Sequence, residues 1–105
     1  MGIVNSLLRI DNVRGEPPLP FERPNAPMNF WVLELPDGHD SFRKWTLQVA
    51  RLLRTHSKLL RQLRRKRAAL TLFIQTEGGP EPLRLDVKFL NQLSELEISL
   101  EHFHS

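Results

Sequence analysis

Apolar and polar positions along the chain change their period several times, which predicts alternating helices and strands. The longest regular pattern runs from Ser41 to Arg67, where apolar residues recur at helical spacing. On a helix turning about 100° per residue they gather within an arc of roughly 120°, so the stretch predicts one long amphipathic helix. The residues of this apolar arc are Phe42, Trp45, Val49, Leu52, Leu53, Leu59, Leu60 and Leu63.

This predicted helix has a start signal, a weak centre and an end near Lys66. Asp40 or Ser41 is suited to accept hydrogen bonds from the first free N–H groups of the helix. Residues 55–57, with the sequence Thr-His-Ser, are poorer helix formers than their neighbours. A bend or a break is therefore plausible there.

Strand signals follow on both sides of the long helix. Runs rich in aromatic and branched residues, or with strict alternation, predict strands at 29–35, 69–76, 83–85 and 97–102. A turn-rich connection at 77–82 separates the second of these strands from the third. Asp86 is suited to cap a second helix, from Val87 to about Leu96.

The beginning of the chain has a different character. Residues 11–27 hold five of the eight prolines, whose fixed φ and missing N–H exclude a helix or a central strand. We therefore expect an N-terminal arm over residues 1–27, with a short strand at 3–10, held to the body by Leu19 and Phe21. A proline-rich ligand for an aromatic-lined groove is the alternative interpretation. A single α+β domain follows over residues 28–105.

From residue 29 onward the predicted order is β-α-β-β-α-β, the split pattern of ferredoxin-like folds. Right-handed crossovers would place both helices on one face of a four-stranded antiparallel sheet. The strand at 29–35 has apolar residues on both faces, with Phe30 and Val32 on one and Trp31 and Leu33 on the other. The arm or a second subunit must then cover the face without helices, and we expect a homodimer.

The last third of the chain carries a hydrophobic pattern in three pieces: LTLFI at 70–74, LRLD at 83–86 and LNQLSELEISLE at 90–101. On these residues, the segment 68–103 resembles a widespread bacterial domain of unknown function, some of whose members are treated as toxin-immunity-like proteins. The resemblance implies an α+β fold in which a helix leads directly into a C-terminal strand. It implies no activity, cofactor or site residue, and the proline-rich start and the basic helix depart from it.

Charge is distributed very unevenly. The formal net charge is +3, but residues 41–67 hold ten of the fifteen Lys and Arg residues and no acidic residue. The rest of the chain is therefore acidic on balance. Opposite the apolar arc, five cations follow one another at spacings of 3, 4, 3 and 4 residues, which stacks side chains along a helix. With one further cation at the helix end, the predicted binding residues are Arg51, Arg54, Lys58, Arg61, Arg65 and Lys66.

These features predict a non-catalytic protein-interaction module that binds an acidic partner protein through the basic helix or a sheet face. The alternative is a nucleic-acid-binding accessory protein that contacts phosphates through the same helix. We favour the first because the helix offers no exposed aromatic residue for base stacking: Trp45 belongs to the apolar arc, and the chain has no Tyr. The structural alternative is that the exposed face of a helix is normally charged and that the helix dipole favours cations near the C-terminus. It accounts for the cations at 64–67, but not for the absence of acidic residues over the 27 positions from 41 to 67.

No residue is assigned to catalysis, to a metal or to a cofactor, and an enzyme is not expected. His102 and His104 share a face of the last strand, a spacing that can begin a metal site, but we expect a structural or solvated role. The segment 37–41, Asp-Gly-His-Asp-Ser, is typical of a turn before a helix cap rather than of a catalytic triad. Without cysteine and without an apolar run of about 20 residues, the chain is expected to be cytoplasmic and not to enter a membrane.

Overall fold

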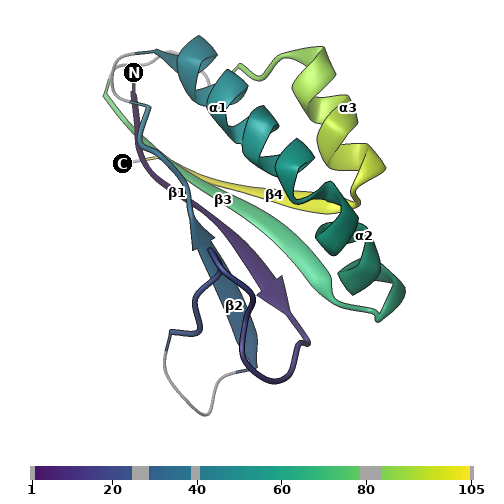
Figure 1. Ribbon diagram of the computed structural model, residues 1–105. Helices are drawn as coiled ribbons and strands as arrows, with labels where there is room; N and C mark the ends of the chain where they lie inside the picture. Colours follow the sequence, from purple (N-terminus) through teal and green to yellow (C-terminus); the bar gives the residue numbers. More distant parts are fainter. Residues whose placement is uncertain (1, 25–28, 39–40, 79–83, 105) are drawn as a thin grey trace.

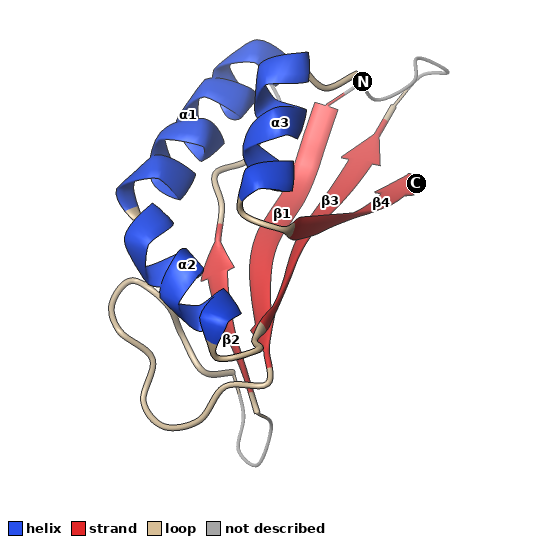
Figure 2. Cartoon of the chain, turned by 90° about the vertical axis from the view of Figure 1, so that its right-hand side faces the viewer, coloured by secondary structure: helices blue, strands red, loops and turns tan. Residues whose placement is uncertain are grey.

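Four strands form one sheet, and three helices cover one of its faces, in the computed structural model, which describes residues 2–24, 29–38, 41–78 and 84–104 (Figures 1 and 2). The predicted α+β class is therefore confirmed. In chain order the elements are β1 (Gly2–Asp11), β2 (Phe30–Glu34), α1 (Phe42–Thr55), α2 (Ser57–Arg65), β3 (Ala69–Glu77), α3 (Val87–Glu95) and β4 (Ile98–His104).

The order of the strands differs from the prediction. Across the sheet it is β2-β1-β3-β4, with β1 antiparallel to both of its neighbours and β4 parallel to β3. The helix α3 joins these two parallel strands as a crossover connection. A ferredoxin-like order is therefore not confirmed, and the prediction of a sheet that is antiparallel throughout is wrong.

The strand order differs from the prediction because of β1, which we expected to be a short strand of the arm. It is ten residues long and occupies the interior of the sheet, where Leu8 pairs with Leu33 on one side and with Leu72 on the other. A strand expected at 83–85 is not seen: Arg84 and Leu85 have no regular secondary structure, and Leu83 lies outside the described residues. The N-terminal segment thus supplies the strand that completes the sheet.

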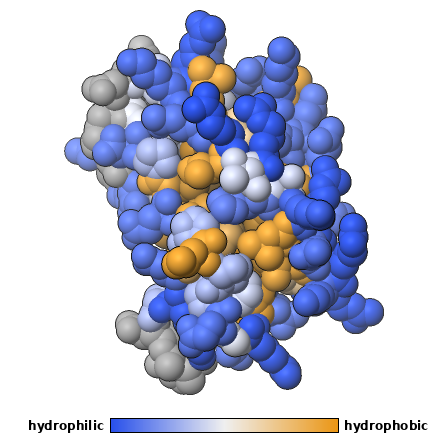
Figure 3. Space-filling model, viewed as in Figure 1, coloured by the Kyte–Doolittle hydropathy of each residue, from blue (hydrophilic) through white to orange (hydrophobic). Residues whose placement is uncertain are grey.

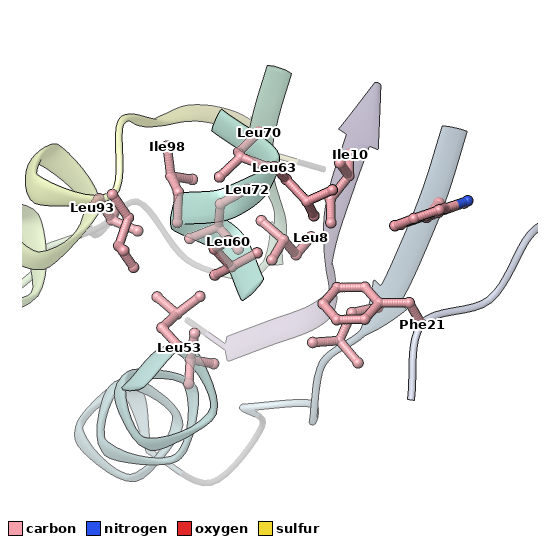
Figure 4. Packing of buried hydrophobic residues seen from close by; sticks show 14 of the residues in the cluster. Leu8, Ile10, Phe21, Leu53, Leu60, Leu63, Leu70, Leu72, Leu93 and Ile98 are labelled. Carbon is pink, nitrogen blue, oxygen red and sulfur yellow. The ribbon is translucent and has the colours of Figure 1, made fainter. Parts of the chain in front are cut away.

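The core lies between the sheet and the helices (Figure 4). Alternate strand residues such as Leu8, Leu72 and Ile74 face it, and the predicted apolar arc of the long helix faces it from the other side. Five of the arc residues are buried and three are half-buried. The buried ones are Trp45, Val49, Leu53, Leu60 and Leu63, and the half-buried ones are Phe42, Leu52 and Leu59.

Two helix starts and the bend follow the local signals. The hydroxyl of Ser41 accepts a hydrogen bond from the backbone N–H of Lys44 at 3.3 Å, and the carboxylate of Asp86 accepts one from the N–H of Lys88 at 3.2 Å. The long helix is interrupted at His56, between α1 and α2, within the stretch where a bend was plausible. Both predicted caps are confirmed at the residues that the structure describes.

The proline-rich arm is docked by Phe21. This side chain is buried and meets the ring of His56 edge-on, with 5.6 Å between the ring centroids. Leu19 is 92% exposed, so its predicted anchoring role is wrong. Next to Phe21, the backbone of Glu22 exchanges two hydrogen bonds of 2.8 Å with Val32. The arm therefore covers the outer edge of β2.

Candidate functional site: the basic helical face

The outward side of α1 and α2 carries the predicted cations. Because the apolar arc of these helices faces the sheet, residues half a turn away point to solvent. Arg51, Arg54, Lys58, Arg61 and Arg65 are all exposed, and we call these five residues the basic stripe. Lys66 is exposed as well and forms the C-cap of α2.

The interruption at His56 does not break the stripe. The backbone N–H of His56 donates to the carbonyl of Leu52 at 3.1 Å, and its own carbonyl accepts from the N–H of Leu60 at 2.9 Å. Hydrogen bonds of the i to i−4 kind therefore pass through the bend, and the spacing of exposed residues continues from one helix to the next. Hydrophilic residues dominate the surface over the helices in the view of Figure 3.

None of the stripe cations forms an ion pair within the described residues. The two ion pairs found there join Arg9 to Asp11 and Arg64 to Glu97, each at 2.9 Å. The acidic side chains that the structure describes therefore form no ion pair with the stripe. The sequence alone could not decide this point, because it depends on where the fold places each carboxylate.

Four acidic residues lie instead on the sheet face that has no helices. Strand alternation places Asp11, Glu34, Glu77 and Glu101 on this outer face, opposite the buried side of each strand. One cation, Arg9, lies among them, with its guanidinium 4.0 Å from the centroid of the Phe30 ring. The two faces of the molecule thus have opposite charge, with the basic face on the helices.

A cleft of about 370 Å³ lies at the end of α2, where the stripe meets the start of β4. Arg64 is fixed in it: its Nε donates to Glu97 at 2.9 Å and its Nη1 donates to the carbonyl of Ala68 at 2.8 Å. Arg61 and Arg65 also line the cleft, without an ion pair to a described residue. Glu95 and Glu97 line the cleft as well, so the charge around it is mixed.

The sequence interpretation missed Leu47. This side chain is 60% exposed and lies four residues before Arg51, in line with the basic stripe. The signal was present, because position 47 falls outside the apolar arc when the helix is drawn as a wheel. An apolar contact point therefore stands at the N-terminal end of a row of cations.

The other surface considered for binding is the outer sheet face. Phe30 and Val32 point to it, while Trp31 and Leu33 are buried under the helices, as predicted. Phe73 and Phe103 stack on it, with 6.2 Å between centroids and 7° between ring planes. These side chains line part of a hollow of about 280 Å³.

The two C-terminal histidines share a face of β4, as expected, and meet one hydroxyl. Oγ1 of the buried Thr76 lies 2.7 Å from Nε2 of His102 and 2.9 Å from Nδ1 of His104. No group of three or more metal-ligating side chains occurs within the described residues. The contacts therefore give both imidazoles a hydrogen-bonding role at the end of the sheet.

The loop before α1 is held by backbone contacts. Gly38 donates to the carbonyl of Ile3 at 2.8 Å, and Ser41 caps the helix, while His39 and Asp40 lie outside the described residues. A Cβ at Gly38 would stand 3.0 Å from Cβ of Trp45, so glycine permits this close approach. Ser41 thus has the cap role that the sequence predicts, while Gly38 forms an isolated antiparallel β-bridge with Ile3 instead of the predicted turn.

Comparison with protein-family models, curated proteins and solved structures finds no match for this chain. Among the described helices, none combines the length and the apolar character that crossing a membrane requires.

Proposed function

We propose that this protein is a non-catalytic, cytoplasmic interaction module that binds an acidic partner protein through the basic stripe of α1 and α2. The observation that carries the proposal is the row of five exposed cations without an ion pair in the described chain. Like charges at i and i+4, such as Arg54 and Lys58, destabilise a helix by a few tenths of a kcal/mol. A bound acidic surface offsets this cost.

The charge of the two faces favours the helices over the sheet as the binding surface. An acidic partner that approached the outer sheet face would meet Asp11, Glu34, Glu77 and Glu101. Like charges brought together across an interface cost several kcal/mol, whereas opposite charges speed and orient association. The acidic partner therefore belongs on the helical side.

Leu47 supports a protein partner over a nucleic acid. A protein surface can offer an apolar side chain beside its carboxylates, and this combination matches an exposed leucine at the end of the basic stripe. Single-stranded nucleic acid is usually held by aromatic side chains that stack on bases, and Trp45 is fully buried here. Backbone-directed binding to nucleic acid through the same cations is the competing function that the experiment must exclude.

The test is a charge reversal with a matched control. One variant replaces Arg54, Lys58, Arg61 and Arg65 by Glu. The control replaces four exposed cations elsewhere by Glu as well: Arg14, Arg23, Arg84 and Lys88. Both variants change the net charge equally. After nuclease treatment, we expect the wild type and the control to retain an acidic protein in a pull-down, and the stripe variant to lose it.

Two direct titrations separate the candidate partners. Binding of duplex and single-stranded oligonucleotides is measured beside binding of a glutamate-rich peptide that contains leucines, at the same ionic strength. Loss of only oligonucleotide binding in the stripe variant would favour the nucleic-acid function. Equal behaviour of stripe variant and control in all assays would contradict both functions. In the variant Leu47→Ser, we expect weaker peptide binding and unchanged oligonucleotide binding.

A further inference from the structure

The two edges of the sheet differ in whether a further segment of the described chain pairs with them. On the outer side of β2, the arm exchanges two backbone hydrogen bonds through Glu22 and Val32. At the other edge, no described element pairs with the outer side of β4. Unpaired N–H and C=O groups of an edge strand are a template for another strand. The sequence of β4, ISLEHFH, contains neither proline nor lysine, two residues that commonly protect such an edge.

Exposed apolar side chains concentrate at this same edge. Of the six large apolar residues that are exposed in the described chain, four belong to α3 and β4: Val87, Leu90, Leu100 and Phe103. The side chain of Gln92 donates to the carbonyl of Ala50 at 2.9 Å, which identifies the side of α3 that faces α1. Leu90 lies about 160° around the helix from it and points away from α1. Figure 2 shows α3 and the start of β4 next to each other.

We propose that a second copy of this chain docks on the free edge, with the two β4 strands antiparallel and Leu100 on the two-fold axis. An interface of this kind uses the same patch on both copies and must be self-complementary. About Leu100, Ile98 lies opposite His102 of the second copy, and Ser99 lies opposite Glu101 of the second copy. The result is one continuous sheet that runs through both copies.

Charge disfavours the neighbouring register centred on Glu101, which would also keep like faces together. With Glu101 on the axis, two carboxylates would lie directly opposite each other, which destabilises a strand pair. With His102 on the axis, two imidazoles would meet at the centre. The Leu100 register brings two leucines together there and leaves each carboxylate opposite a serine hydroxyl.

Charge also favours edge pairing over stacking of two outer sheet faces. Stacking would bring Glu34 and Glu101 of one copy against the carboxylates on the outer sheet face of the other. In the edge-paired dimer the two outer faces lie side by side, and the two helical layers lie on the same side of the shared sheet. Both basic stripes then belong to one surface, although the dimer itself does not depend on what the stripes bind.

The register is tested by disulfide formation, because the chain has no cysteine of its own. In the proposed dimer, the two Cα atoms of residue 100 are about 4.5 to 5.5 Å apart, within the range that a disulfide spans. The two copies of residue 102 are offset by four residues, or about 13 Å along the strands. We expect mild oxidation to link Leu100→Cys into dimers and to leave the matched control His102→Cys monomeric on a denaturing gel.

A charge pair at Ser99 tests the same contact without disturbing the core, since Ser99 is exposed. Ser99→Lys places an ammonium opposite Glu101 of the second copy, and Ser99→Glu places a carboxylate there. We expect dimer Kd values that differ by about tenfold between the two variants, because the pair occurs twice in each dimer.

Light scattering of the wild type completes the test. A mass of 12.3 kDa at every concentration would overturn the dimer. Oxidation that links Glu101→Cys or His102→Cys better than Leu100→Cys would overturn the register, as would equal Kd values for the two Ser99 variants.

Discussion

At the scale of single residues, Ser6 is a polar side chain on the buried face of β1, and Trp45 is its buried hydrogen-bond partner. The indole Nε1 of Trp45 donates to the hydroxyl of Ser6 at 3.1 Å, and this hydroxyl donates to the carbonyl of Pro36 at 3.3 Å. Both side chains are buried. The pair thus joins β1, α1 and the segment after β2 by polar contacts within an apolar core.

Removing the hydroxyl leaves the indole N–H without a partner. We expect Ser6→Ala to lower the free energy of unfolding by about 1 to 3 kcal/mol, which is the cost of a buried unsatisfied donor. Urea denaturation measures it. In a Trp45→Phe background the donor is absent, so the same substitution should cost clearly less. Equal costs in both backgrounds would contradict the role of this hydrogen bond.

Arg67 shows a backbone cost at the end of α2. Its φ is +67°, in the left-handed region, and the following residue Ala68 donates from its N–H to the carbonyl of Leu63 at 3.0 Å. A side chain in this conformation costs about 1 kcal/mol or more relative to glycine. We therefore expect Arg67→Gly to raise the free energy of unfolding by about 0.5 to 1 kcal/mol, after allowing for the greater freedom of glycine in the unfolded chain.

The matched control is Arg67→Ala, which removes the same charged group but keeps the Cβ atom. In thermal or urea unfolding, the stability of Arg67→Ala should be close to that of the wild type, and Arg67→Gly should be more stable than either. If alanine stabilised the protein as much as glycine, loss of the positive charge rather than backbone strain would be the cause.

At the scale of elements, local signals were sufficient for the helices and for β2 and β3. Ser41 and Asp86 cap helices because their side chains accept hydrogen bonds from N–H groups two or three residues away. Such a short-range interaction can be predicted from the neighbouring residues. The partners of β1 were not predictable in this way. They lie at Leu33 and Leu72, far along the chain, and the sequence of residues 3–10 does not indicate which strands will pair with it.

In the candidate site, too, some features follow from the local sequence and others depend on the fold. Spacing alone predicted the basic stripe, because an amphipathic helix that buries one side must expose the other. The absence of ion pairs to the stripe among residues 2–24, 29–38, 41–78 and 84–104 was not predictable, because it depends on where the fold places carboxylates such as Glu34 and Glu101. Leu47 was overlooked although its helical position was known.

The arm provides a test at this scale. Phe21 is buried against His56, at the junction of α1 and α2, so it links the arm to both helices. We expect Phe21→Ala to lower the free energy of unfolding by about 3 to 5 kcal/mol, the usual cost of removing a core phenylalanine. The control Leu19→Ala should stay within about 0.5 kcal/mol because that side chain is exposed. Comparable losses in the two variants would contradict docking through Phe21.

At the scale of the whole molecule, the basic stripe lies on α1 and α2, and four carboxylates lie on the opposite, outer face of the sheet. Within the basic stripe, Lys58 stands four residues after Arg54 and three before Arg61, so it feels like charges on both sides. Neither neighbour is relieved by an ion pair within the described residues. The free protein therefore carries an electrostatic cost that salt can screen.

This cost predicts how stability depends on salt. The Debye length falls from about 30 Å at 0.01 M to about 8 Å at 0.15 M ionic strength, so added salt should raise the unfolding temperature of the wild type. Lys58→Glu should be more stable than the wild type at low salt by several tenths of a kcal/mol and should gain less from added salt. Arg23→Glu makes the same change of charge in the exposed arm and should follow the wild type. A wild-type stability that fell with salt would mean that the cations take part in favourable pairs, and the stripe would then need no external partner to offset it.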